Sequence, residues 1–121
     1  MPRYVIQLHQ ARSLHYDFRL EVDGVLRSWA VPKGPSEDPA EKRLAVQVPD
    51  HSLEHGDYEG PTVEIWDRGV YEPLTDGSFA AALDDGHASF VLDGERLQGG
   101  WTLHRTSDGE KPQWLLIKKR D

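Results

Sequence analysis

The chain has 121 residues, which fits one domain over residues 1–121, and a formal net charge of −7. This charge argues against a protein that coats nucleic acid through a broad basic surface, because phosphate neutralisation dominates that kind of binding. The absence of cysteine excludes disulfides and thiolate zinc sites, so a bound metal would need histidine, carboxylate or water ligands.

Short apolar runs punctuated by glycine and proline are typical of an all-β chain. The first predicted strand covers residues 3–8. The second covers residues 14–22, where apolar and ionisable side chains alternate with the period of two that marks a strand. Asp23-Gly24 favours a type I′ turn, so residues 26–32 are expected to return as the second arm of a hairpin.

The remainder of the chain predicts five further strands and one short helix. Turn signals lie at Asp67-Arg68-Gly69 and Asp93-Gly94. Ser78 is a candidate N-cap for a helix over residues 78–83. The predicted strands cover residues 43–48, 62–66, 88–92, 100–105 and 113–118. We therefore expect a mainly antiparallel, closed or partly open barrel of about eight strands with at most one short peripheral helix, and with the four tryptophans in its core.

The clearest candidate site is a row of ionisable side chains on the second predicted strand. His15, Asp17 and Arg19 share one face at spacings of roughly 6.6 Å. Imidazole and carboxylate are good ligands for manganese or zinc, and the guanidinium fork matches phosphate oxygens. Residues 1–33 also carry a local charge of +2, against −9 for the remainder. This row therefore predicts a site for a metal-bound phosphate.

Other histidines and cations are weaker candidates. His9 lies six residues before His15 across a polar loop, and a strand–loop–strand path would bring both imidazoles to one ion. Arg43 opens a predicted strand and His51 follows its end, so we expect these two phosphate-compatible groups to converge on the site. Lys33 lies between Pro32 and Gly34 and is interpreted as a solvated loop lysine. The remaining pair, His87 and His104, is interpreted as structural.

Several long strings resemble the 3′-phosphoesterase domain of bacterial DNA ligase D and its stand-alone relatives. In chain order these are HQARSLHYDFRLEVDGVLRSWAVPKGPS, KRLAVQVPDHSLE, VEIWDRGVYEP, GERLQGGW and PQWLLIKKRD. The resemblance implies a compact β-barrel enzyme that requires a divalent metal, typically Mn²⁺, with Zn²⁺ or Co²⁺ as further options. It also implies removal of a 3′-terminal ribonucleoside to leave a 3′-phosphate, and hydrolysis of that phosphate to a 3′-hydroxyl.

Site roles follow from the resemblance by position. It implies that the metal ligands are His9, His15 and Asp17. It implies that the scissile phosphate is bound by Arg19, Arg43 and His51, with Lys33 assisting. The expected partners are nucleic-acid 3′ ends, of DNA or of RNA-ended primer–templates, together with end-joining ligase and polymerase proteins. No signal peptide or membrane span is visible, so a cytoplasmic monomer without membrane contact is expected.

Three departures from the family pattern keep other functions open. Pro49 replaces an acidic residue, His55 replaces a tyrosine, and a Gly-rich loop is missing between Gly60 and Thr62. These changes motivate a non-catalytic or partly active module that binds 3′ ends. The acidic charge of the chain suits a phosphodiesterase of small nucleotides instead. The weakest alternative is a structural β-domain with surface histidines.

Overall fold

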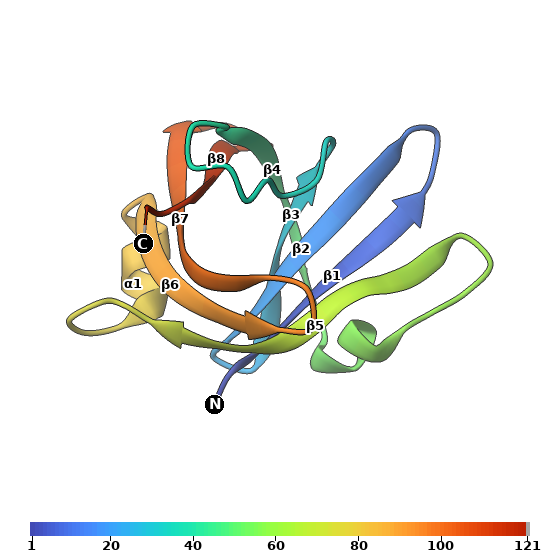
Figure 1. Cartoon of the computed structure of the whole chain (residues 1–121), viewed down its shortest axis with the longest axis horizontal. Helices are drawn as coiled ribbons and strands as arrows, with labels where there is room; N and C mark the ends of the chain where they lie inside the picture. The colour runs from blue at the N-terminus through green and yellow to red at the C-terminus, as the bar shows by residue number, and fades with distance from the viewer. Residues whose placement is uncertain (121) are drawn as a thin grey trace.

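The computed structural model describes residues 1–120, which fold into a closed barrel of eight antiparallel strands (Figure 1). Around the barrel the strands follow the order β1-β2-β3-β4-β8-β7-β6-β5. Their bounds are β1 (Arg3–Gln10), β2 (Leu14–Val22), β3 (Val25–Val31), β4 (Arg43–His51), β5 (Val63–Pro73), β6 (His87–Gly94), β7 (Gln98–Ser107) and β8 (Gln113–Lys118). The predicted all-β barrel is confirmed.

Two short helical segments accompany the strands. The predicted helix is present as α1 (Phe79–Asp84), and the Ser78 side chain caps it by accepting a hydrogen bond from the Ala81 amide at 3.2 Å. A 3₁₀ helix, η1 (Leu53–Asp57), follows β4 and was not predicted. Its five residues are too few and too polar to show a helical period. Within residues 1–120, neither helical segment is long and apolar enough to cross a membrane.

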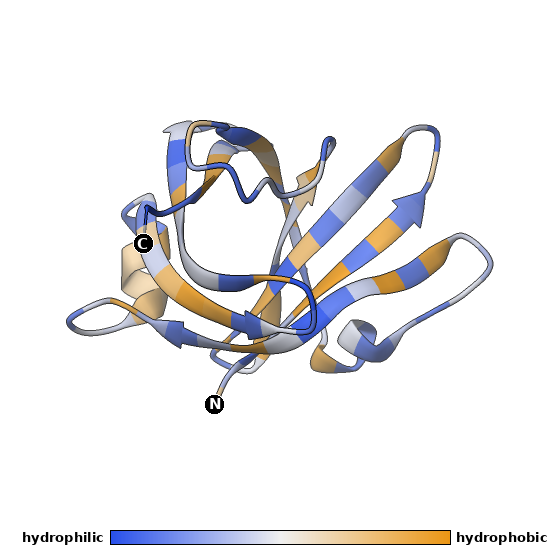
Figure 2. Cartoon of the chain, viewed as in Figure 1, coloured by the Kyte–Doolittle hydropathy of each residue, from blue (hydrophilic) through white to orange (hydrophobic). Residues whose placement is uncertain are grey.

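The barrel interior holds the core, and the strand surfaces alternate between apolar and polar bands (Figure 2). Three of the four tryptophans, Trp29, Trp101 and Trp114, are fully buried, as predicted. Trp66 is partly buried and packs edge-on against Tyr16 with ring centroids 5.4 Å apart. The interior is therefore filled by large side chains, and a polar site on these strands must lie on their outer face.

One predicted turn is confirmed and another is wrong. Asp23 and Gly24 have φ angles of 50° and 84°, as a type I′ turn requires. At Asp67-Arg68-Gly69, however, β5 continues without turning. The buried Asp67 carboxylate instead accepts hydrogen bonds from the amides of Arg96 and Leu97, at 2.8 and 3.1 Å. Gly69 lies so close to β6 that a Cβ atom would overlap that strand's backbone.

Strand register places the candidate row beside a second polar row. On β2, Phe18 faces the core, so its neighbours Asp17 and Arg19 project from the opposite, outer face. β1 pairs antiparallel with β2, so that Gln7 lies opposite Asp17 and His9 lies opposite His15. The β1–β2 hairpin therefore gathers histidine, carboxylate and arginine on the outside of the barrel.

The loop after β3 depends on a glycine at position 34. Gly34 has a φ of 75°, and a Cβ atom there would lie 2.8 Å from the Tyr16 ring. Gly24 has a similar φ of 84° but open space around it. We predict that Gly34→Ala lowers the free energy of unfolding by about 2–5 kcal/mol, and Gly24→Ala by only about 1–2 kcal/mol. Urea denaturation measures both, and equal losses would contradict the Tyr16 contact.

Candidate active site

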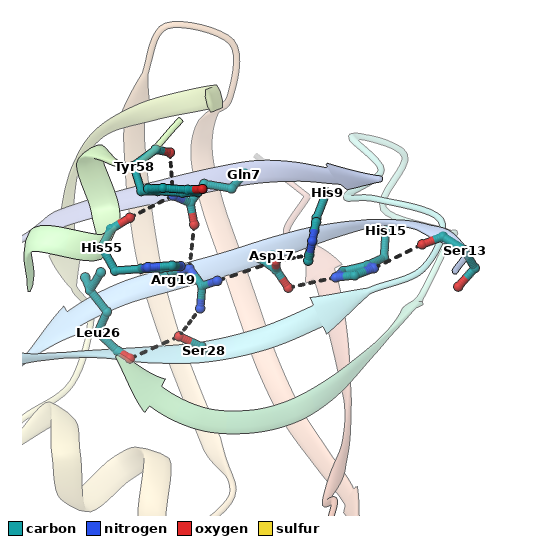
Figure 3. A network of polar contacts seen from close by, with 10 residues as sticks. All are labelled: Gln7, His9, Ser13, His15, Asp17, Arg19, Leu26, Ser28, His55 and Tyr58. Carbon is teal, nitrogen blue, oxygen red and sulfur yellow. Dashed lines mark hydrogen bonds and ion pairs between the residues drawn. The ribbon is translucent and has the colours of Figure 1, made fainter. Parts of the chain in front are cut away.

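The carboxylate of Asp17 is the centre of a cluster on the outer face of β1 and β2 (Figure 3). Its Oδ1 lies 3.2 Å from Nε2 of His15, and its Oδ2 lies 3.5 Å from Nδ1 of His9. A guanidinium nitrogen of Arg19 lies 3.4 Å from the same Oδ2. The Asp17 residue is 7% exposed, so these neighbours replace much of its solvent. A buried carboxylate of this kind requires cations or hydrogen-bond donors around it.

The orientation of His15 suits it as a metal ligand. Its Nδ1 lies 3.3 Å from the backbone carbonyl of Ser13, which can only accept a hydrogen bond, so Nδ1 is the ring nitrogen that carries hydrogen. Nε2 is then the ring nitrogen that faces the Asp17 carboxylate, 3.2 Å from its Oδ1, where both atoms can bind one ion. A backbone carbonyl behind a histidine is also a common arrangement in metal sites.

The three predicted ligands are close enough to bind one ion. Ligand atoms of His9, His15 and Asp17 all lie within 4.8 Å of one another. Bonds of about 2.0–2.2 Å allow ligand atoms to lie up to about 4.4 Å apart, so a small movement of the rings completes the site. Among residues 1–120 this is the one group of three or more such side chains with the required spacing. The donor set of two imidazoles and one carboxylate fits a divalent transition metal.

Arg19 is held by two hydrogen bonds and one ion pair and is 4% exposed. Its Nε donates to the Gln7 side-chain oxygen at 2.7 Å, and one terminal nitrogen donates to the Ser28 hydroxyl at 2.8 Å. The other terminal nitrogen pairs with Asp17. Burial lowers the pKa of Arg19 from its ordinary value, and the Asp17 charge counteracts that effect. The guanidinium is thus fixed in place with its terminal N–H groups beside the pocket.

Gln7 connects this row to the 3₁₀ helix η1. Its side chain is fully buried on the outer face of β1, where its Nε2 donates to the carbonyls of His55 and Tyr58 at 2.8 and 3.2 Å. Its Oε1 accepts the hydrogen bond from Arg19. Both ends of one amide therefore fix η1 over Arg19, as Figure 3 shows.

A stack of three rings forms another side of the site. His51 and His55 stack with centroids 4.3 Å apart and an interplanar angle of 16°, and Tyr58 continues the stack at 5.6 Å from His55. Burial and the positive charge of Arg19 lower the pKa of both imidazoles below the usual value for histidine. At neutral pH both rings are therefore uncharged, and an approaching anion would favour their protonation.

These groups line one open pocket of about 510 Å³. Asp17 and Arg19 form part of its lining, and residues of β1, β2, β4, the η1 segment and the start of β5 contribute the remainder. The complete lining is Gln7, His9, His15, Asp17, Arg19, Val48, His51, His55, Tyr58, Thr62 and Val63. We call this the active-site pocket.

The structure gathers five of the seven predicted site residues in this pocket and leaves out Arg43 and Lys33. Arg43 and His51 occupy opposite ends of β4, roughly 26 Å apart in a straight strand. Strand alternation also puts Arg43 on the face of the buried Ala45, opposite the face of Val48. Arg43 and His51 thus do not converge, and phosphate binding by Arg43 and Lys33 stays a prediction.

Two of the three departures from the family pattern border the pocket. His55 lines it and stacks on His51. The short connection that replaces the Gly-rich loop is a tight turn, in which Gly60 and Val63 exchange backbone hydrogen bonds of 2.9 and 3.3 Å. Pro49 is exposed and does not line the pocket. The third change therefore affects the surroundings of the site rather than its wall.

Sequence reasoning missed Gln7 and Tyr58 as parts of the site, and it treated His55 only as a departure. The alternation along β1 offered a signal for Gln7, because it lies two residues before His9 on the same face. Nothing in the sequence indicated the ring stack. His87 and His104, interpreted as structural, face each other across β6 and β7 with centroids 5.6 Å apart, and both are exposed and outside the pocket.

Comparison with known proteins points to one family. The family model described as the DNA Ligase D 3′-phosphoesterase domain matches residues 7–105. The Multifunctional non-homologous end joining protein LigD of Pseudomonas aeruginosa is 54% identical over 98% of this chain, and that of Mycolicibacterium smegmatis is 39% identical over 98%. The Multifunctional non-homologous end joining DNA repair protein LigD of Mycobacterium tuberculosis is 42% identical over 98%.

The chain covers only 15%, 17% and 16% of these relatives, respectively. It therefore corresponds to one part of a much longer protein in each organism. The matches extend over 129, 132 and 130 positions, more than the 121 residues of this chain, so each relative has residues in the matched region that this chain lacks.

The ligand geometry predicts that Mn²⁺ stabilises the wild-type fold. An ion at one hundred times its dissociation constant adds about 2.7 kcal/mol, which raises the melting temperature by several degrees. We expect His15→Ala to lose this rise, and the exposed His104→Ala to keep it. Thermal unfolding followed by circular dichroism, with and without Mn²⁺, measures the difference. An equal rise in both variants would place the ion elsewhere.

The buried amide of Gln7 predicts a large cost for its removal. Gln7→Leu leaves the Arg19 Nε–H and two carbonyls without their partner, which should lower the free energy of unfolding by about 2–4 kcal/mol. Gln10→Leu, on the same strand but exposed, should change it by less than about 0.5 kcal/mol. Urea denaturation compares the two, and a mild effect of Gln7→Leu would show that η1 is held by other contacts.

Proposed function

The chain belongs to the family of DNA ligase D 3′-phosphoesterase domains, and from this premise we propose that it is a metal-dependent hydrolase acting on the 3′ end of a nucleic-acid strand. Its proposed reactions are removal of a 3′-terminal ribonucleoside and hydrolysis of a 3′-phosphate, which leave a 3′-hydroxyl. The proposed context is end-joining DNA repair, in line with the names of its relatives.

One observation carries this proposal: a metal-competent triad and a fixed guanidinium line the same open pocket. Asp17 contacts His9 and His15 on one side and Arg19 on the other. Phosphate ester hydrolysis is promoted by cationic groups beside the phosphate oxygens and by a cation that binds the attacking water. The pocket lies on the outer face of the barrel, where the end of a strand can reach it without entering the core.

The metal site and the phosphate site share Asp17 as their common neighbour. His9, His15 and Asp17 would hold a divalent cation, for which Mn²⁺ is the proposed identity and Zn²⁺ or Co²⁺ are alternatives. When bound, such an ion supplies Lewis-acid polarisation of a phosphate oxygen and lowers the pKa of a bound water.

The remaining polar side chains bind and orient the phosphate. Arg19 directs its terminal N–H groups at the pocket and stabilises negative charge on the phosphate oxygens. His51 is uncharged at neutral pH in the free pocket, and the phosphate anion raises its proton affinity. It is then placed to donate a proton or a hydrogen bond to the leaving oxygen.

A second candidate function is a module that binds 3′ ends with weak or no turnover. It is favoured by His55 in the pocket wall and by the tight turn at Gly60 and Val63, which offers no cover for a substrate. A phosphodiesterase of small nucleotides is a third candidate, because the chain is acidic overall. Release of inorganic phosphate from a 3′-phosphate-ended primer–template, but not from a mononucleotide, would exclude both alternatives.

The cellular setting follows the same premise. We propose a cytoplasmic monomer that acts on DNA ends or on RNA-ended primer–templates, beside end-joining ligase and polymerase activities. The names of the relatives give non-homologous end joining as their process, and this chain matches only about a sixth of the length of each. The ligase and polymerase activities are therefore proposed as partners of the domain described by this sequence.

Arg19→Lys tests the role of the guanidinium. Lysine keeps the charge but cannot bind Gln7, Ser28 and Asp17 at once, so kcat on a 3′-phosphate-ended primer–template in Mn²⁺ should fall by about 10²–10³-fold. Arg27→Lys is the control, because Arg27 is a partly buried, ion-paired arginine of β3 that does not line the pocket. Equal turnover by both variants would remove Arg19 from the mechanism.

A further inference from the structure

A second concave region lies between the end of β3 and the start of β4. It is a pocket of about 410 Å³ lined by Pro32, Lys33, Glu41, Lys42, Arg43 and Leu44, which we call the basic pocket. Three of these six residues are cations and one is an acid, in a chain whose net charge is −7. A local excess of positive charge on an acidic protein marks a place where an anion is favoured.

The single acid of the basic pocket does not balance its lysines. One Glu41 oxygen accepts a hydrogen bond from the Ser36 hydroxyl at 2.9 Å, and the other pairs with Arg43 at 3.5 Å. Within residues 1–120, no ion pair involves Lys33 or Lys42. In the same range, the buried Nε of Arg43 has no hydrogen-bond partner. The ammonium groups of Lys33 and Lys42 are therefore the two cations of the pocket that no acid of the described residues neutralises.

An apolar stripe connects the basic pocket to the active-site pocket. Leu44, Val46 and Val48 share the outer face of β4 by strand alternation. Leu44 is 41% exposed and lines the basic pocket, while Val48 lines the active-site pocket. The two ends of the stripe are four residues, or roughly 13 Å, apart. A cation-rich pocket, an apolar strip and a metal-competent pocket thus follow one another along a single strand.

We propose that the outer face of β4 binds the nucleic-acid strand that leads to the 3′ end, with a backbone phosphate upstream of the scissile one in the basic pocket. This inference rests on the proposed function and adds the path of the substrate. A nucleic-acid strand carries anionic phosphates beside the apolar faces of its sugars and bases, which matches a basic pocket that is continued by Leu44, Val46 and Val48. The proposal gives Lys33 and Lys42 a role outside the active-site pocket.

The test is binding of a single strand of ten nucleotides with a 3′-phosphate, followed by fluorescence anisotropy in EDTA, which prevents turnover. A mononucleoside 3′-phosphate serves as the short competitor. We expect Lys42→Gln to weaken binding of the strand on the order of three- to tenfold. The slope of the logarithm of the binding constant against the logarithm of the salt concentration should become shallower by about 0.7. The affinity of this variant for the mononucleotide should stay unchanged. Lys33→Gln and Leu44→Ser should also weaken binding of the strand.

Arg68→Gln is the matched control. It removes one positive charge from an exposed side chain on β5, in a different pocket, and should leave binding of the strand unchanged. The inference is overturned if Lys42→Gln binds the strand as Arg68→Gln does. It is also overturned if Lys42→Gln loses as much affinity for the mononucleotide as for the strand.

The two proposals fail separately in this experiment. A wild-type chain that shows the expected binding pattern but releases no phosphate in Mn²⁺ contradicts the proposed hydrolase function and leaves the strand path supported. A wild-type chain that hydrolyses the substrate while Lys42→Gln binds like wild type contradicts the strand path and leaves the hydrolase function supported.

Discussion

The carboxylate of Asp17, nearly buried on the outer face of β2, is the interaction on which the candidate site depends. A charge in that position is stable only if cations or donors surround it. Arg19 fills one side at 3.4 Å, while the imidazoles of His9 and His15 approach from the other at 3.5 and 3.2 Å. Nδ1 of His15 faces the Ser13 carbonyl, so its Nε2 is the nitrogen that faces Asp17 and is available to a metal ion.

The barrel makes this arrangement possible by separating its two faces. Its interior is filled with aromatic and aliphatic side chains, so polar residues of the same strands project outward. On that outer face, η1 replaces solvent above Arg19 and is tied to it through the amide of Gln7. Stability and function are therefore linked, because the contacts that hold η1 also fix the guanidinium and bring the His51–His55–Tyr58 stack to the pocket.

Much of the fold was predictable from local patterns. The alternation over residues 14–22 and the Asp23-Gly24 turn give the β2–β3 hairpin directly, and the same alternation puts His15, Asp17 and Arg19 on one face. The turn predicted at Asp67 was wrong because aspartate followed closely by glycine is typical of turns. Here the Asp67 carboxylate is buried and accepts hydrogen bonds from the amides of Arg96 and Leu97. A prediction from neighbouring residues cannot detect that contact, because its partners lie about 30 positions apart in the sequence.

The row on β2 was predictable from strand alternation, and His9 on β1 and His51 on β4 were also expected in the site and found there. Gln7 and His55 enter the pocket through pairing and through η1, which depend on residues far apart in the sequence. Arg43 was expected beside His51, but the length of β4 and the alternation of its side chains separate them. The proposed path of a nucleic-acid strand along β4 starts from the basic pocket that Arg43 lines.

The most direct test of the account is the position of Mn²⁺ in crystals of this chain, located by anomalous scattering. One strong peak is expected between the His9 and His15 rings and the Asp17 carboxylate. A peak at another position, or none at saturating Mn²⁺, would contradict it.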